Sequence, residues 1–300
     1  MASTESTYLR DLYADWSTRM AANPEMGLAG MRAIFEEWHL PTVEPTRVTY
    51  ETVRAGGVEA MWCVPTGARL DRAILYLHGG GFAVGSMHSH RKLAGHIAKA
   101  AGCRALVPNY RLAPEHPFPA GIEDNLTAYR WLLEQGIDAS AIALCGDSAG
   151  GNLSLTTTLK ARDEGLPLPG AIAVMSPFCD LEVTGETMTT RAAYDTLVNH
   201  EIASGMGAML LGQGDRNIPL ANPLLADLTG FPPLHIEVGD HECLLADSEQ
   251  LAQHAEKAGV EVTLSVVPEM QHVFPILAGR CTEGDEAVAR IAAHITAHLS

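Results

Sequence analysis

Short apolar runs alternate with longer helical patterns from about residue 70 onward, and this alternation constrains the fold more than any other feature of the chain. Strands are expected at 73–77, 105–108, 141–145, 171–175, 234–238 and 262–267. Helices are expected at about 89–101, 121–135, 150–163, 246–258 and 284–299. Because parallel strands need long crossover connections, this pattern predicts an α/β fold with a mostly parallel sheet and helices on both faces.

Three other segments depart from this alternation. Residues 48–53 and 58–64 alternate apolar and polar side chains on either side of a Gly-Gly pair, which predicts a hairpin. Residues 1–45 carry apolar side chains at helical spacing, and we expect one or two amphipathic helices that either pack onto the body or cover a pocket. We therefore separate residues 1–45 from a main domain at 46–300, which carries an insertion at about 180–220.

Composition excludes several classes of partner. The 300 residues are 47% hydrophobic, enough for one large domain with a sizeable core. The formal net charge of −16 would repel phosphate backbones and anionic lipid headgroups, so we expect no nucleic acid partner. The six cysteines form no C-x-x-C pair, which predicts neither a zinc site nor a disulfide framework.

The first twenty residues have no basic stretch followed by an apolar one, and no apolar run in the chain reaches membrane-spanning length. From this we expect a cytoplasmic protein without stable membrane association.

The sequence Gly146-Asp-Ser-Ala-Gly150 follows the predicted strand at 141–145 and begins a predicted helix. In that context a G-x-S-x-G pattern indicates a nucleophile elbow, in which flanking glycines let the backbone crowd a sharp turn and expose the serine oxygen. The beginning of the helix directs positive partial charge at an anion formed there. Ser148 is therefore the candidate nucleophile.

Three glycines follow another predicted strand, in His78-Gly-Gly-Gly-Phe82. Acyl transfer develops negative charge on a carbonyl oxygen, and preorganised backbone N–H groups stabilise that charge. The candidate oxyanion donors are the N–H groups of Gly80, Gly81 and Ala149.

A serine nucleophile needs a base held by an acid. His272 lies in a loop after the strand at 262–267, and the loop at 239–247 offers Asp240 and Glu242 as acids. The chain order Ser, acid, His is that of α/β hydrolases. The pair His88 and His90 is the alternative as metal ligands, but no cysteine or carboxylate cluster completes a set, so no metal site is predicted.

Together these motifs, with the block Asn109-Tyr-Arg-Leu-Ala-Pro-Glu-His-Pro-Phe-Pro119, resemble the hormone-sensitive-lipase-like branch of the α/β-hydrolase fold in its bacterial esterase form. The resemblance runs from about residue 70 to the end of the chain. It implies a carboxylic-ester hydrolase with an eight-stranded sheet, no metal or organic cofactor, and a small helical cap made of residues 1–45 and about 180–220. Within the block, Arg111 and Glu115 are expected to pair as part of the scaffold.

The resemblance also bears on the acid, the substrate and the competing functions. In the family pattern a leucine stands two positions after the acid, which favours Glu242 with Leu244 over Asp240. Expected substrates are small esters with short acyl chains. Lactone hydrolysis and lipase action use the same centre and remain alternatives, as does a non-catalytic small-molecule receptor on the same fold.

The apolar strand at 262–267, with few charges, favours a homodimer formed by pairing of sheet edges.

Overall fold

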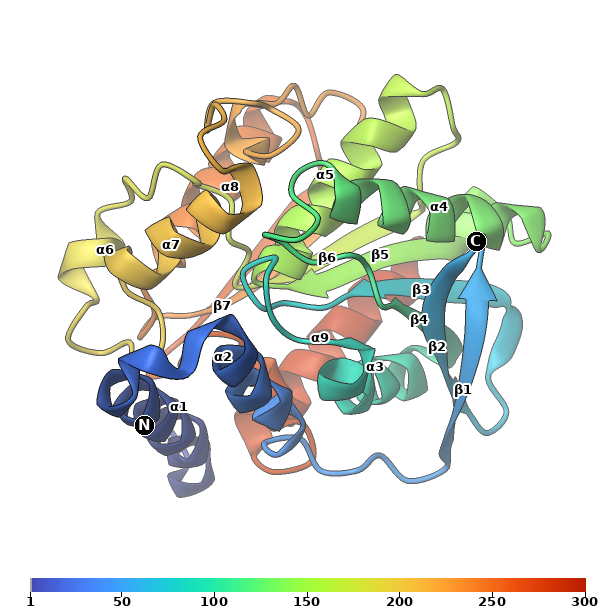
Figure 1. Ribbon diagram of the computed structural model, residues 1–300. Coiled ribbons are helices and arrows are strands. Elements are labelled where there is room, and N and C mark those ends of the chain that lie inside the picture. The colour runs from blue at the N-terminus through green and yellow to red at the C-terminus, as the bar shows by residue number, and fades with distance from the viewer. Residues whose placement is uncertain (1) are drawn as a thin grey trace.

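An eight-stranded sheet forms the centre of the computed structural model, which describes residues 2–300 (Figure 1). The strands are β1 (Val48–Ala55), β2 (Val58–Pro65), β3 (Arg69–Leu77), β4 (Cys103–Pro108), β5 (Ile142–Asp147), β6 (Ala171–Met175), β7 (Leu234–Gly239) and β8 (Val262–Val267). Their spatial order is β1-β2-β4-β3-β5-β6-β7-β8. The β1-β2 and β2-β4 pairs are antiparallel and all the others are parallel. The predicted α/β fold with a mostly parallel eight-stranded sheet is confirmed.

Long helices cover both faces of the sheet. Packed against each other on one face are α3 (Met87–Ala101) and α9 (Thr282–His298). On the other face lie α4 (Ala120–Glu134), α5 (Ala149–Asp163) and α8 (Leu245–Lys257). Each helix begins one or two residues before its predicted start. By contrast, β3 begins well before the predicted run at 73–77. Residues 69–72 are largely exposed and carry no buried-strand pattern, so the sequence did not indicate that they belong to the strand.

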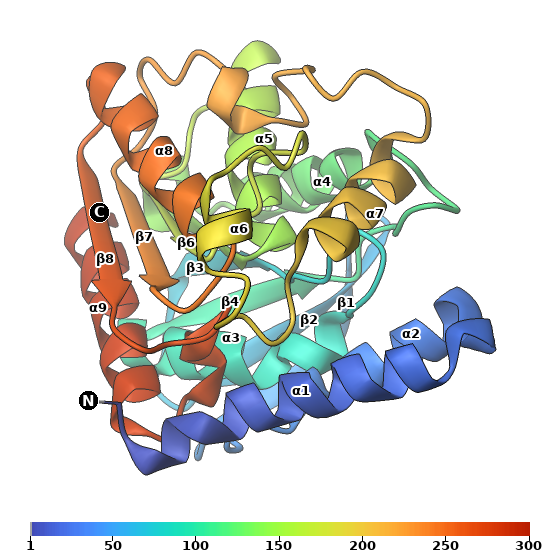
Figure 2. The ribbon, with the colours of Figure 1, turned by 90° about the vertical axis from the view of Figure 1, so that its left-hand side faces the viewer.

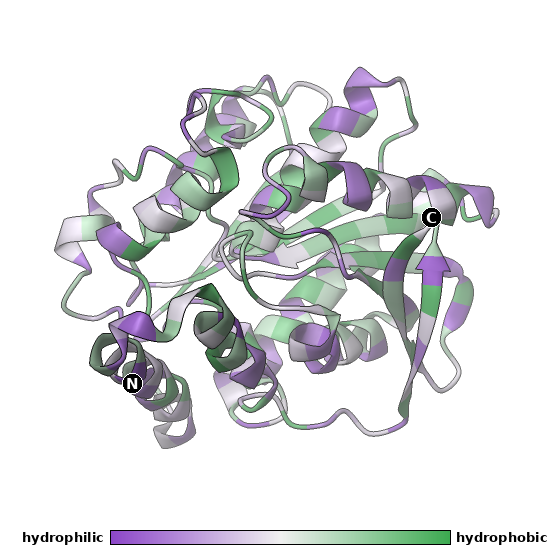
Figure 3. Cartoon of the chain, in the orientation of Figure 1, coloured by the Kyte–Doolittle hydropathy of each residue, from purple (hydrophilic) through white to green (hydrophobic). Residues whose placement is uncertain are grey.

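Hydrophobic residues gather on the central strands, which are mostly green in Figure 3, whereas purple is common on the surrounding helices. Every residue of β5, β6 and β7 is buried, as expected for parallel strands covered on both faces. Within residues 2–300 we find no helix with both the length and the apolar character needed to cross a bilayer.

Two groups of helices lie at the same end of the sheet (Figures 1 and 2). One comes from the N-terminal segment and comprises α1 (Thr7–Ala22), α2 (Gly27–Phe35) and a 3-10 turn at Glu36–His39. The other comes from the insertion and comprises α6 (Thr187–Thr190) and α7 (His200–Leu211). Aromatic side chains fix the N-terminal group, since Phe35 lies 5.2 Å from both Trp16 and Trp38 between ring centroids.

Contacts of the 109–119 block correct one expectation. Arg111 does not pair with Glu115: its guanidinium instead binds the carboxylate of Asp124 at 2.8 Å. The carboxylate of Glu115 instead forms an ion pair with the guanidinium of Arg32 on α2, at 2.7 Å. Arg32 also donates to the carbonyl oxygens of Ala83 and Ala113, so this block anchors the N-terminal helices to the main domain.

Candidate active site

Ser148 stands at the corner between β5 and α5, with φ 52° and ψ −120°. This backbone conformation is uncommon for a residue with a side chain and is typical of a constrained functional turn. A Cβ at Gly150 would collide with the carbonyl oxygen of Leu77, and one at Gly146 would collide with the backbone of Gly150. The two glycines of the pentapeptide are therefore required by close backbone approach, as the nucleophile-elbow interpretation expects.

The structure brings His272 and Glu242 to Ser148. The Nε2 atom of His272 lies 3.0 Å from Ser148 Oγ, and its Nδ1 atom lies 2.9 Å from Glu242 Oε2. All three side chains are buried. Because a carboxylate can only accept, Nδ1 carries the proton, which leaves the Nε2 lone pair directed at the serine hydroxyl.

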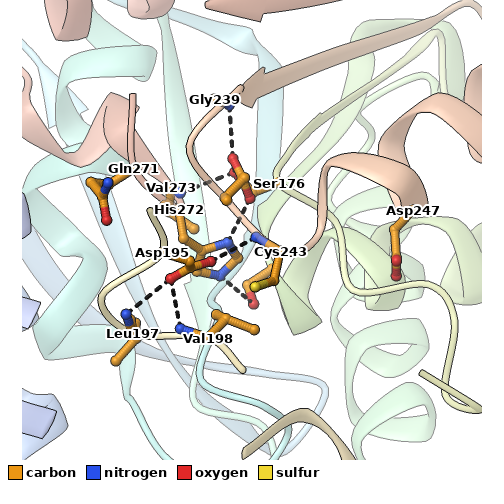
Figure 4. Close-up of polar contacts among 12 residues, drawn as sticks. Ser176, Asp195, Leu197, Val198, Gly239, Cys243, Asp247, Gln271, His272 and Val273 are labelled. Carbon is orange, nitrogen blue, oxygen red and sulfur yellow. Dashed lines mark hydrogen bonds and ion pairs between the residues drawn. The ribbon is translucent and has the colours of Figure 1, made fainter. Parts of the chain in front are cut away.

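Three acids of the loop at 239–247 have different surroundings. Glu242 Oε1 accepts from Ser176 Oγ at 2.8 Å and from the Gly239 N–H at 2.7 Å, while Oε2 faces His272 (Figure 4). Asp240 accepts the backbone N–H of Glu269, whereas the carboxylate that contacts His272 is that of Glu242. Asp247 holds the N–H groups of residues 179 and 180, and burial raises its pKa to about 7. Of the three, Glu242 is the one placed to orient His272.

Opposing effects act on the protonation of His272. Burial is the largest single effect and lowers the pKa of the imidazole. The hydrogen bond to Glu242 and the negative charges of Glu242, Asp195 and Asp147 together outweigh burial, so the pKa lies above the ordinary value of 6.5. A base must be neutral to accept a proton, so activity is lost as the pH falls through the pKa of His272. Because that pKa is raised, the loss begins at a higher pH than for an ordinary histidine.

We therefore expect kcat/KM for a soluble ester to fall with decreasing pH, with the midpoint of the acid limb above 6.5. The measurement is a pH profile of initial rates, with tryptophan fluorescence recorded at each pH to establish that the enzyme stays folded. A midpoint at or below 6.5 in folded enzyme would contradict a base coupled to Glu242.

The glycine loop after β3 has the backbone that its sequence predicts. Gly80 and Gly81 have φ 113° and 56°. Side chains at these positions would collide with the Val84 carbonyl and with Met206 of α7. Both glycines border the same cavity as Ser148. Ala149 is the first residue of α5, so its N–H has no partner within the helix.

A cavity opens beside Ser148. Its walls come from the two groups of helices at this end of the sheet and from neighbouring loops, through apolar side chains that include Phe35, Trp38, Leu197, Ile202 and Met206. The N-terminal segment thus both packs onto the body and lines a pocket, which unites the two interpretations of residues 1–45.

The two histidines considered as metal ligands, His88 and His90, lie in different surroundings. His90 is fully buried, with Nε2 3.3 Å from Asp147 Oδ2, and His88 lies on the exposed side of the same turn. Asp147 also receives the hydroxyl of Tyr76 at 2.6 Å. Among residues 2–300, no group of three or more His, Cys, Asp or Glu side chains is arranged to hold a metal ion.

Sequence reasoning missed three residues around the histidine. Ser176 directly follows β6, and the rule that sites lie at carboxyl ends of strands would have found it. Asp195, in the insertion, accepts hydrogen bonds from the backbone N–H groups of Leu197, Val198 and Cys243 (Figure 4). Since Leu197 and Val198 line the cavity and Cys243 lies in the loop at 239–247, Asp195 connects a wall of the cavity to that loop. Tyr13, on α1, donates its hydroxyl to the backbone carbonyl of His272.

Comparisons with known proteins agree with this arrangement. A family model described as the alpha/beta hydrolase fold matches residues 74–276. An acetyl-hydrolase of Streptomyces hygroscopicus is 42% identical over 272 residues, covering 84% of this chain and 90% of that protein. An esterase of Acinetobacter venetianus is 32% identical over 257 residues, covering 85% and 83%. The crystal structure of an esterase from the bacterial hormone-sensitive lipase family has a TM-score of 0.93 at 42% identity and covers all of both chains.

Fold and sequence similarity together define an enzyme of the α/β-hydrolase class. The chain belongs to the hormone-sensitive-lipase branch of that fold, among the bacterial esterases, and is a carboxylesterase-type serine hydrolase. The resemblance predicted from the sequence is confirmed. The relatives carry hydrolase and esterase names, which favours an enzyme over the receptor alternative.

Proposed function

We propose that this enzyme hydrolyses carboxylic esters with short acyl chains through an acyl-enzyme intermediate, with Ser148, His272 and Glu242 as the catalytic triad. The observation that carries the proposal is the unbroken line of contacts from Ser148 Oγ through His272 to Glu242, at 3.0 Å and 2.9 Å, beside an apolar cavity. No cofactor takes part in this mechanism.

Attack on the ester begins at Ser148. Its oxygen forms a bond to the carbonyl carbon while His272 Nε2 takes the hydroxyl proton. Glu242 then faces an imidazolium and stabilises its charge. The carbonyl oxygen becomes an oxyanion, for which the N–H groups of Gly80, Gly81 and Ala149 are the proposed donors.

The intermediate collapses when His272 Nε2 returns its proton to the departing alkoxide. A water molecule then gives a proton to the same nitrogen and attacks the acyl carbon. When the acyl–Oγ bond breaks, His272 gives that proton to Ser148 Oγ, which releases the carboxylic acid and restores the serine hydroxyl. One histidine therefore serves as base and acid in both halves of the reaction.

Residues 1–45 and about 180–220 are proposed as the two pieces of a cap on the catalytic domain at 46–300. The side chains that they contribute to the walls of the cavity support this division. The cytoplasmic location and the absence of stable membrane association stay predictions. So does the homodimer, for which β8 offers an edge because it stands last in the sheet.

For substrates we expect turnover of dissolved esters with acyl chains on the order of two to eight carbons, and no increase when a long-chain ester forms an emulsion. The reason is that fixed helices, anchored by Arg32 and by buried aromatic side chains, cover a cavity of limited volume. Initial rates on a nitrophenyl-ester series of increasing chain length, measured below and above the solubility limit, test the expectation.

A lactone panel run beside that series separates the alternatives that share the centre. Activity that rises steeply at the solubility limit would identify a lipase and contradict the proposal. Hydrolysis of lactones at rates far above those for the open esters would replace the proposed substrate class.

A further inference from the structure

One peptide group carries the histidine of the site, and it is held from two sides. The carbonyl oxygen of His272 accepts the hydroxyl of Tyr13 at 3.0 Å. The N–H of Val273, which belongs to the same peptide plane, donates to Ser176 Oγ at 3.0 Å (Figure 4). Tyr13 comes from α1 and Ser176 from the end of β6, so the two ends of this peptide bind parts of the chain that are distant in sequence.

The backbone at this point would not hold its shape alone. Val273 has φ 55° and ψ 39°, a left-handed conformation that is a genuine outlier for a β-branched residue. Such conformations persist only when surrounding contacts determine them. The two hydrogen bonds to the 272–273 peptide are contacts of that kind.

Tyr13 is itself oriented. Its side chain is completely buried, and its oxygen accepts the indole N–H of Trp38 at 3.0 Å. With that acceptor site occupied by Trp38, the single hydroxyl proton is directed at the His272 carbonyl. Trp38 also forms part of the cavity wall, so the same aromatic group touches both the pocket and the support of the histidine.

Ser176 connects the peptide to the acid. Its hydroxyl donates to Glu242 Oε1 at 2.8 Å and accepts from Val273, while its own backbone N–H is bound to the carbonyl of Glu237 on β7. One side chain therefore fixes the distance between the carboxylate and the backbone of the histidine that it orients.

We propose that Tyr13 and Ser176 are positioning residues that clamp the 272–273 peptide and so aim the His272 imidazole at Ser148. Helix α1 then supports catalysis through the backbone of His272, whereas the N-terminal residues that line the cavity, Phe35 and Trp38, lie outside α1. The inference rests on the proposed function, because it assigns His272 the role of the base.

The test compares Tyr13→Phe and Ser176→Ala with Tyr129→Phe. Tyr129 is the matched control, since it is a buried tyrosine of α4 whose hydroxyl donates to the Pro167 carbonyl at 2.8 Å and takes no part in the site. We expect Tyr13→Phe and Ser176→Ala each to lower kcat about 10- to 100-fold with KM within about twofold, because a misdirected base affects the chemical step more than binding. Tyr129→Phe should lower the melting temperature but keep the wild-type kcat.

A spectroscopic readout separates positioning from general destabilisation. The proton on His272 Nδ1 should give a downfield NMR signal in the wild type, shifted or broadened in Tyr13→Phe and in Ser176→Ala but unchanged in Tyr129→Phe. If Tyr13→Phe does not fold, Ser176→Ala tests the same peptide from its other side. Folded variants with wild-type kcat and an unchanged signal would overturn the clamp. A wild type that hydrolyses no ester would instead overturn the proposed function.

Discussion

Ser148→Ala is expected to lower kcat for a short, soluble ester by about 10⁴- to 10⁶-fold, because the nucleophile and base act as a unit and little of their effect survives the loss of one member. The residual rate would come from the oxyanion donors and from substrate binding.

Folding should be nearly unaffected by the same change. The Ser148 hydroxyl contacts His272 but does not cap α5, so its removal deletes one hydrogen bond, a change of about 1 kcal/mol in the free energy of unfolding. Gly146 and Gly150, which permit the close backbone approach at this turn, both remain.

Activity and thermal unfolding of purified Ser148→Ala, measured together, check both statements. Thr158→Val is a matched control, because it deletes a buried hydroxyl of the same helix, almost three turns further on, that donates to the carbonyl of Ser154. The control should keep wild-type kcat. Wild-type activity in folded Ser148→Ala would place the nucleophile elsewhere.

The sheet and the positions of the candidate site residues could be predicted from the sequence because each carries a local signal. Buried parallel strands are continuous apolar runs, and the elbow and the glycine loop have backbone requirements that only glycine meets. His272 was identifiable because it follows a strand that ends at the same edge of the sheet as β5.

The supports of the site could not be predicted in the same way. Tyr13 meets the carbonyl of His272 across 259 positions of sequence, and in α1 it has the same helical spacing as any packed aromatic residue. The contact of Arg32 with Glu115 depends on how α2 lies on the body, and the sequence instead suggested the neighbour Arg111. Such contacts follow from tertiary packing, which no local pattern specifies.

Glu242→Gln is expected to lower kcat by about 10⁴-fold, because the hydrogen bonds of the site decide which way the new amide turns. Ser176 and Gly239 both donate to the position of Oε1, so the amide oxygen must stand there and the NH₂ group must face His272 Nδ1. An NH₂ group donates, which forces the ring proton onto Nε2 and leaves Ser148 without a base.

The neighbouring acid provides the control. The Asp240 side chain is 30% exposed, and an asparagine there can still accept the Glu269 N–H, so Asp240→Asn should change kcat by less than about threefold. The two variants are compared by kcat on one soluble ester and by melting temperature, since both replacements are nearly isosteric. An inactive Asp240→Asn beside a nearly normal Glu242→Gln would assign the triad acid to Asp240. It would also mean that the hydrogen bond between Glu242 and His272 is not the one that catalysis uses.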